Sequence, residues 1–207
     1  MSMPAYALRD SATMLRRNLR RLERYPSLAV FPILIPVVLL LLFVYVFGGT
    51  LGNGLGVPSG GRNAYANYLA PGILLFTIAG AAQMAAISIA KDMTERIIAR
   101  FRTMAIWRPS VLTGHVLASV IQSLLSVCVV VGVALLTGFR PTADTLDWLG
   151  AAGLLALAAL ALAWLCIALG LVTKSVEAAS NLPMLLTLLP FLGSSFVPVD
   201  SMPAGIR

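Results

Sequence analysis

The sequence is short of the charged residues that a water-soluble protein needs. Asp, Glu, Lys and Arg make up 11% of its 207 residues, while hydrophobic residues make up 59% and the mean hydropathy is +0.91. A soluble domain carries about 25% charged residues. A chain of this composition cannot cover a globule with polar groups, so its solvent must be a lipid bilayer.

The residues that build catalytic and metal sites are also scarce. The one histidine, His115, excludes a site with several His ligands, and we interpret Cys128 and Cys166, deep in apolar runs, as packing residues. The sequence has no phosphate-binding loop, no paired carboxylates and no Ser-His-Asp pattern. We therefore predict that the chain is not an enzyme and that it binds neither a cofactor nor a metal.

Charged residues are absent from the middle of every long apolar run. A carrier coupled to protons or ions usually needs a titratable group at membrane depth, so the energy for any solute movement must come from elsewhere. The net charge of +7 does not indicate nucleic acid as a partner. The basic residues flank the apolar runs, which is the distribution expected for contact with a lipid bilayer.

Five apolar segments predict an all-α membrane protein with one transmembrane domain, residues 27–207. A helix needs about 20 residues to cross a bilayer. The predicted spans are 27–47, 69–90, 111–137, 148–172 and 181–197. Residues 48–67 are expected to form a loop. Because Pro183, Pro190 and Gly193 interrupt the last span, we expect it to be short or partly unwound.

Residues 1–26 predict a basic amphipathic helix at the membrane surface. Apolar residues recur there at helical spacing, and arginines fill the remaining faces. The apolar stripe is Leu8, Ala12, Leu15, Leu19 and Leu22, and the arginines include Arg16, Arg17, Arg20 and Arg21. A cleaved signal peptide is the alternative, but the apolar run that follows is too long for one.

Residues 91–109 form the one long charged segment between two apolar runs and predict a short amphipathic helix. Its apolar residues recur every three or four positions. Lys91 and Glu95, and likewise Asp92 and Arg96, are opposite charges four residues apart and are expected to pair. Periodicity alone does not distinguish a charged loop at the membrane surface from a docking helix for a partner protein.

A polar stripe runs along the third predicted span. It consists of His115, Ser119, Gln122 and Ser126, at helical spacing. Such a stripe in a membrane helix faces protein or a water-lined path rather than lipid. Helix packing and a substrate path both stay open, with packing the safer interpretation.

The basic residues predict that the N-terminus lies in the cytoplasm. In this orientation twelve Lys and Arg fall in cytoplasmic segments, whereas Arg62, Arg140 and Arg207 fall outside. Lys and Arg are enriched in the cytoplasmic loops of membrane proteins. The charged segment 91–109 is therefore expected inside and the C-terminal end outside.

The sequence contains the motifs FVYVFGG at 43–49, NYLAPGIL at 67–74, DMTERIIARFRTM at 92–104 and LPFLGSSFVPVDSMP at 189–203. These four motifs resemble the membrane subunit of ABC exporters of the type-2 permease family, in particular its daunorubicin-resistance branch. FVYVFGG at 43–49 is similar to the end of the family's first span, and NYLAPGIL at 67–74 to the start of its second. DMTERIIARFRTM at 92–104 resembles the cytoplasmic coupling segment. LPFLGSSFVPVDSMP at 189–203 resembles the outer signature before the last span. That signature includes Gly193, Ser194, Pro198, Asp200 and Pro203.

The resemblance implies a six-span subunit that pairs with a second permease copy, each docked on a separate cytoplasmic ATP-binding subunit. The N-terminal helix and the coupling segment would contact that subunit. The candidate contacts are Asp92, Glu95, Arg96, Arg100, Phe101 and Arg102. The complex would export an amphipathic compound, an antibiotic or a lipid-linked molecule, across the cytoplasmic membrane of a bacterium.

The sequence also departs from the family pattern. The family usually has glycine where Arg96 stands, proline where Ala105 stands and arginine where His115 stands. The sequence ends at Arg207, before the sixth span would begin, and is expected to be truncated relative to the family. The alternatives to an exporter subunit are therefore a non-transporting assembly protein or inactive fragment and, more distantly, an ATP-independent carrier.

Overall fold

The regular structure is helical throughout the residues that the computed structural model describes, which are 3–53, 61–98, 107, 109–141, 143–173, 175–192 and 196. The elements are α1 (Met3–Arg24), α2 (Pro26–Leu42), the π-helix η1 (Phe43–Phe47), α3 (Gly48–Asn53), α4 (Arg62–Thr94), α6 (Pro109–Thr137), α7 (Thr145–Val172) and α8 (Val176–Leu192). The predicted all-α class is confirmed.

In the part of the chain that the structure describes, four stretches are long and apolar enough to cross a membrane. They are Ala29–Gly52, Arg62–Thr94, Pro109–Thr137 and Thr145–Val172. The first runs through α2, η1 and α3, which follow one another without a break. The fifth predicted span, 181–197, overlaps α8, which has 17 residues against the roughly 20 that a spanning helix needs. A count of five spans therefore remains a prediction.

Two segments differ from their predicted conformation. The loop predicted at 48–67 is wrong at both ends, because 48–53 form α3 and 62–67 belong to α4. The helical hydrogen bonding of the flanking apolar runs extends over the glycines and polar residues there. In α8, Pro183 and Pro190 lie inside a continuous helix, so 176–192 is short but not unwound. Neighbouring helices allow proline within a membrane helix.

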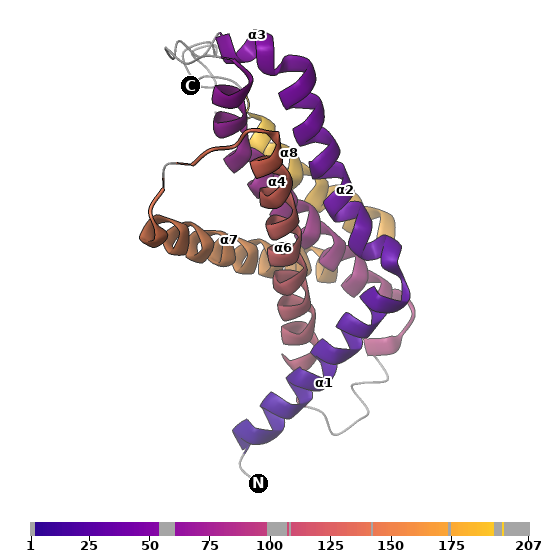
Figure 1. The fold of residues 1–207 in the computed structure, drawn as a ribbon. Helices are drawn as coiled ribbons and strands as arrows, with labels where there is room; N and C mark the ends of the chain where they lie inside the picture. Colours follow the sequence, from indigo (N-terminus) through magenta and orange to yellow (C-terminus); the bar gives the residue numbers. More distant parts are fainter. Residues whose placement is uncertain are drawn as a thin grey trace.

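The centre of the bundle is α4. It packs against α2, α6, α7 and α8, which Figure 1 shows around it. Its buried face is rich in small residues, among them Ala66, Ala70, Gly72, Ala79, Ala81, Ala82, Ala85, Ala86 and Ala90. Small side chains let the backbones of membrane helices approach closely, which increases their van der Waals contact.

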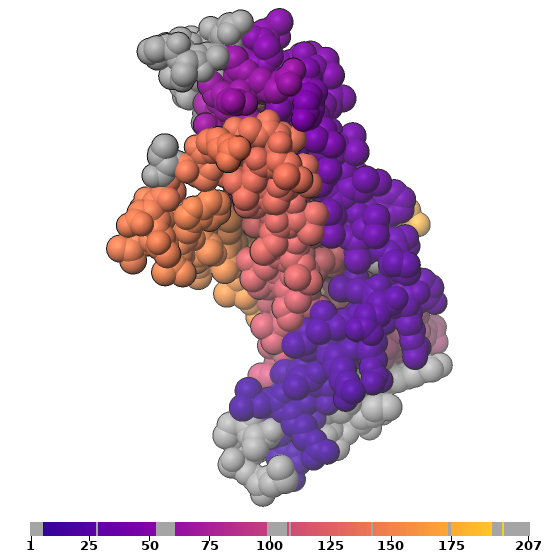
Figure 2. Space-filling view, viewed as in Figure 1, coloured from indigo at the N-terminus to yellow at the C-terminus, as the bar shows by residue number. Residues whose placement is uncertain are grey.

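The contact between α4 and α7 depends on a glycine of α7. A Cβ atom added at Gly170 would lie 2.7 Å from the carbonyl oxygen of Ala86 and 2.7 Å from Cγ2 of Ile89. Any larger residue must therefore push the two helices apart. The other half of α7 has no such contact, because residues 145–154 are exposed and project away from the bundle (Figures 1 and 2).

We predict that Gly170→Val lowers the thermal midpoint of the protein in detergent. Overpacking a close helix contact costs about 1–3 kcal/mol of unfolding free energy. The matched control is Gly153→Val on the same helix, where an added Cβ meets no atom within 4 Å. Equal midpoints for the two variants would contradict the close approach of α4 and α7.

Candidate functional site

α1 lies against the beginning of α6, as Figures 1 and 2 show at the N-terminal end of the molecule. The hydroxyl oxygens of Ser11 and Thr113 are 3.0 Å apart and join the two helices. A Cβ atom added at Gly114 would lie 2.6 Å from Cβ of Met14. The absence of a side chain at this position of α6 therefore allows α1 to pack closely.

One carboxylate lies at the centre of this junction. Asp92, in the last turn of α4, is 1% exposed. Arg17 Nη2 donates a hydrogen bond to Oδ2 of Asp92, and Arg21 Nη1 lies 3.6 Å from Oδ1. His115 Nε2 lies 3.3 Å from Oδ2. Since the two arginines belong to α1 and the histidine to α6, a single side chain joins three helices.

The charges of this cluster favour the burial of Asp92. A buried carboxylate is costly unless opposite charge and hydrogen bonds compensate for the lost hydration. The side chains of Arg17 and Arg21 are 32% and 26% exposed, so they neutralise the carboxylate while keeping part of their own hydration. Two guanidinium groups against one carboxylate leave an excess of one positive charge, before any charge on His115 is counted.

The single helix predicted over 91–109 is wrong at its beginning. α4 continues to Thr94, and the chain then turns at Arg96, whose φ of 57° lies in the left-handed region that favours glycine. The Arg96 N–H donates to the carbonyl oxygen of Met93 at 3.1 Å, which caps the end of α4. Arginine gives no signal for such a turn, so periodicity missed it; the signal is the glycine that the family usually has at this position.

One of the two predicted ion pairs is present. Lys91 Nζ lies 3.6 Å from Glu95 Oε1, on the exposed side of the last turn of α4. The predicted pair of Asp92 and Arg96 is wrong, because Asp92 is buried against α1 and α6 while Arg96 is exposed. Spacing along one helix does not show which of its charges faces another helix.

The four arginines singled out on α1 separate into two pairs. Arg17 and Arg21 face Asp92, whereas Arg16 and Arg20 are exposed. Arg17 and Arg21 would stabilise the junction with Asp92, whereas Arg16 and Arg20 do not contact this carboxylate. Their proposed contact with a partner subunit stays a prediction.

The leucines of α1 differ in their exposure. Among the described side chains of α1, the two buried ones are Met14 and Asn18, which lie between the leucines in the sequence. Leu8 is 74% exposed. Leu15, Leu19 and Leu22 are half-buried.

The polar stripe of α6 faces protein. His115, Ser119, Gln122 and Ser126 are all buried. The hydroxyl of Ser126 donates to the backbone oxygen of Gln122 at 2.8 Å, which satisfies it within the helix. Ser119 and Gln122 line a cavity, so a role in a substrate path stays a prediction for these two residues.

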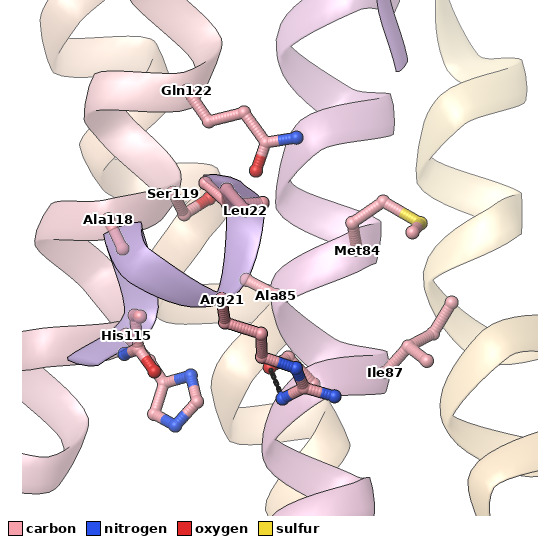
Figure 3. A pocket seen from close by; sticks show the side chains of 11 residues that line it. Arg21, Leu22, Met84, Ala85, Ile87, His115, Ala118, Ser119 and Gln122 are labelled. Atoms are coloured by element: carbon pink, nitrogen blue, oxygen red, sulfur yellow. Dashed lines mark hydrogen bonds between the residues drawn. The ribbon is translucent and has the colours of Figure 1, made fainter. Parts of the chain in front are cut away.

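This cavity has a volume of about 80 Å³ and lies between α1, α4 and α6. Its polar lining consists of Asn18, Arg21, Ser88, His115, Ser119 and Gln122. Figure 3 shows side chains of α6 and α1 directed into the space beside α4. Arg21 Nη1 donates to the hydroxyl of Ser88 at 3.0 Å, the contact that is dashed in Figure 3. Its guanidinium group is therefore held at the wall of the cavity.

Much of the predicted site lies outside the described residues. This applies to Arg100, Phe101 and Arg102 of the coupling segment, and to Gly193, Ser194, Pro198, Asp200 and Pro203 of the outer signature. Phe196, within that signature, is described and buried. Its ring stacks on Phe191 of α8 with centroids 4.2 Å apart and lies 5.5 Å from the ring of Phe43 in η1.

The chain belongs to the ABC-2 type transporter family, since residues 10–207 match the model of that family. Among individual proteins, it is 28% identical to the daunorubicin resistance ABC transporter permease protein DrrB1 of Streptomyces coeruleorubidus over 207 residues, which are 99% of this chain and 71% of the relative. The relative's name describes a permease component. No solved structure matches the chain. The resemblance noted in the sequence is confirmed.

We predict that Asp92→Asn destabilises the junction of α1, α4 and α6. The substitution leaves Arg17 and Arg21 without their counter-charge, at a cost of about 1–3 kcal/mol. The thermal midpoint in detergent should fall, and limited proteolysis within α1 should become faster. The control Glu95→Gln removes an exposed pair worth less than about 1 kcal/mol. Equal effects of the two substitutions would contradict the central role of Asp92.

We predict that Arg96→Gly stabilises the protein. Glycine adopts a positive φ without the steric cost of about 1 kcal/mol that an L side chain meets there. The thermal midpoint should therefore rise. Glu95→Gly should lower it, because Glu95 has a φ of −77° and gains nothing from glycine. A fall in both variants would show that the turn at Arg96 is not left-handed.

Proposed function

We propose that this chain is the membrane-spanning subunit of an ATP-driven exporter and that a separate cytoplasmic subunit hydrolyses ATP. The observation that carries the proposal is the buried Asp92 junction in a chain of the ABC-2 type transporter family. It joins α1 to the end of α4 and the beginning of α6, at the start of the proposed coupling segment 92–102. Force applied to this segment or to α1 would reach two apolar helices at once.

The mechanism follows from the shared carboxylate. ATP binding would close the partner subunits and push the coupling segment and the exposed side of α1. Because Asp92 holds Arg17 and Arg21 of α1 and contacts His115 of α6, these three helices would move together. Their movement would reshape the path between this chain and a second permease copy, either identical or a close paralogue.

Exposed charges mark the surface that would meet the ATP-binding subunit. Arg16 and Arg20 on α1, and Glu95 after α4, are free of the buried cluster. Arg100, Phe101 and Arg102 are assigned to the same surface by the family resemblance. This arrangement requires the N-terminus to lie in the cytoplasm of a bacterial cell, with the chain in the cytoplasmic membrane.

The substrate would be an amphipathic compound, an antibiotic or a lipid-linked molecule. The relative's name contains daunorubicin, an antibiotic, which makes this compound a rational first probe. Ser119 and Gln122 would belong to the substrate path only if the cavity that they line opens toward it during transport. The outer signature would close the opposite end of the path, where Phe196 packs on Phe191.

We predict that the tagged chain, extracted gently from its native membranes, retains an ATP-binding subunit. Reversing two charges of the proposed contact, with Glu95→Lys and Arg100→Glu together, should abolish this recovery. Arg140→Glu is the matched control, because Arg140 follows α6 at the opposite end of that helix from Asp92. Mass spectrometry of the retained proteins is the readout.

Three results of this experiment would contradict the proposal. The first is a stable chain that retains no ATP-binding subunit. The second is an equal loss in the control and in the double variant. The third is recovery of a different membrane complex whose abundance rises and falls with that of this chain, while daunorubicin flux stays unchanged. That result would favour an assembly protein.

A further inference from the structure

The cavity beside Asp92 has a chemistry that the proposed function does not use. It combines the excess positive charge of the arginine pair with buried polar groups that have no partner. We propose that this cavity binds the phosphate group of an anionic phospholipid. The proposal concerns a lipid that stays with the protein, and it does not depend on the identity of the exported compound.

The charge at the cavity favours an anion. Asp92 neutralises one of the two guanidinium groups that face it, and Arg21, which lies 3.6 Å from Oδ1 of Asp92, also lines the cavity. α1 carries six arginines against Asp10 and Glu23, an excess of four positive charges. A phosphate group can accept two parallel N–H···O hydrogen bonds from one guanidinium group. Such charge-assisted hydrogen bonds are stronger than those between neutral groups.

Two buried polar atoms in the cavity wall have no hydrogen-bond partner among the described residues. They are Oδ1 of Asn18, a residue that is 8% exposed, and Oγ of Ser119, a residue that is 4% exposed. Leaving such a group unsatisfied costs about 1–3 kcal/mol. The Ser119 hydroxyl can donate to a phosphate oxygen, and rotation of the Asn18 amide would present its NH₂ group. A phosphate in the cavity would therefore satisfy both.

The rest of the wall suits the lipid part of the ligand. Leu22, Met84 and Ile87 line the cavity together with its polar groups. A phospholipid whose phosphate lies near Arg21 would therefore find apolar contacts for its glycerol backbone and its first acyl carbons. Water would fit a volume of about 80 Å³ and satisfy the polar atoms, but it would not balance the excess charge.

The test is native mass spectrometry of the delipidated full chain in detergent. The probes are dioleoyl phosphatidylglycerol, dioleoyl phosphatidylcholine and inorganic phosphate. We expect retention of phosphatidylglycerol, weaker retention of the zwitterionic lipid, and none of phosphate alone. Arg21→Gln should weaken phosphatidylglycerol binding about tenfold or more, as expected for the loss of a charge-assisted hydrogen bond.

The matched control is Arg24→Gln, on the same helix but exposed and outside the cavity lining; it should leave binding nearly unchanged. If Arg21→Gln does not fold, Ser119→Leu takes its place, because it fills the cavity while leaving the contacts of Arg21 and Asp92 intact. Equal losses for Arg21→Gln and Arg24→Gln would overturn the proposal. So would unchanged binding to Ser119→Leu, equal retention of the two lipids, or binding of inorganic phosphate without lipid.

Discussion

The arrangement of this protein depends on the need to neutralise one buried carboxylate. Asp92 ends an apolar helix at the point where α1 and α6 meet it, and 1% of its surface is exposed. Burial without opposite charge would be prohibitive. Arg17 and Arg21 supply that charge only if α1 lies across the beginning of α6. The position of α1 is therefore set by electrostatics as well as by packing.

Close helix approach is the second condition. In a bilayer the hydrophobic effect does not drive helices together, so association relies on van der Waals contact and hydrogen bonds. Small residues provide this contact along α4. Gly114 brings α6 against α1, and Gly170 brings α7 against α4. The buried cluster around Asp92 is therefore joined to the apolar bundle by close helix contacts. A subunit that transmits force from its surface to its membrane helices would need such a connection.

The sequence predicted the helical class and the long apolar helices, because the spacing of apolar residues and the length of apolar runs can be read from neighbouring residues alone. It did not predict the burial of Asp92, because the partner charges on α1 lie 75 and 71 positions away in the chain. It missed the turn at Arg96 because glycine, the usual signal for a positive φ, is absent there. The grouping of Ser119, Asn18 and Arg21 around one cavity likewise depends on tertiary contacts.

The central claim is that Asp92 holds α1 against α6, and disulfide cross-linking tests it most directly. The hydroxyls of Ser11 and Thr113 lie 3.0 Å apart, so Ser11→Cys with Thr113→Cys, in a chain whose Cys128 and Cys166 are replaced by alanine, should cross-link readily in membranes. Adding Asp92→Asn should reduce the yield sharply. A failure to cross-link, or a yield that Asp92→Asn leaves unchanged, would contradict the account.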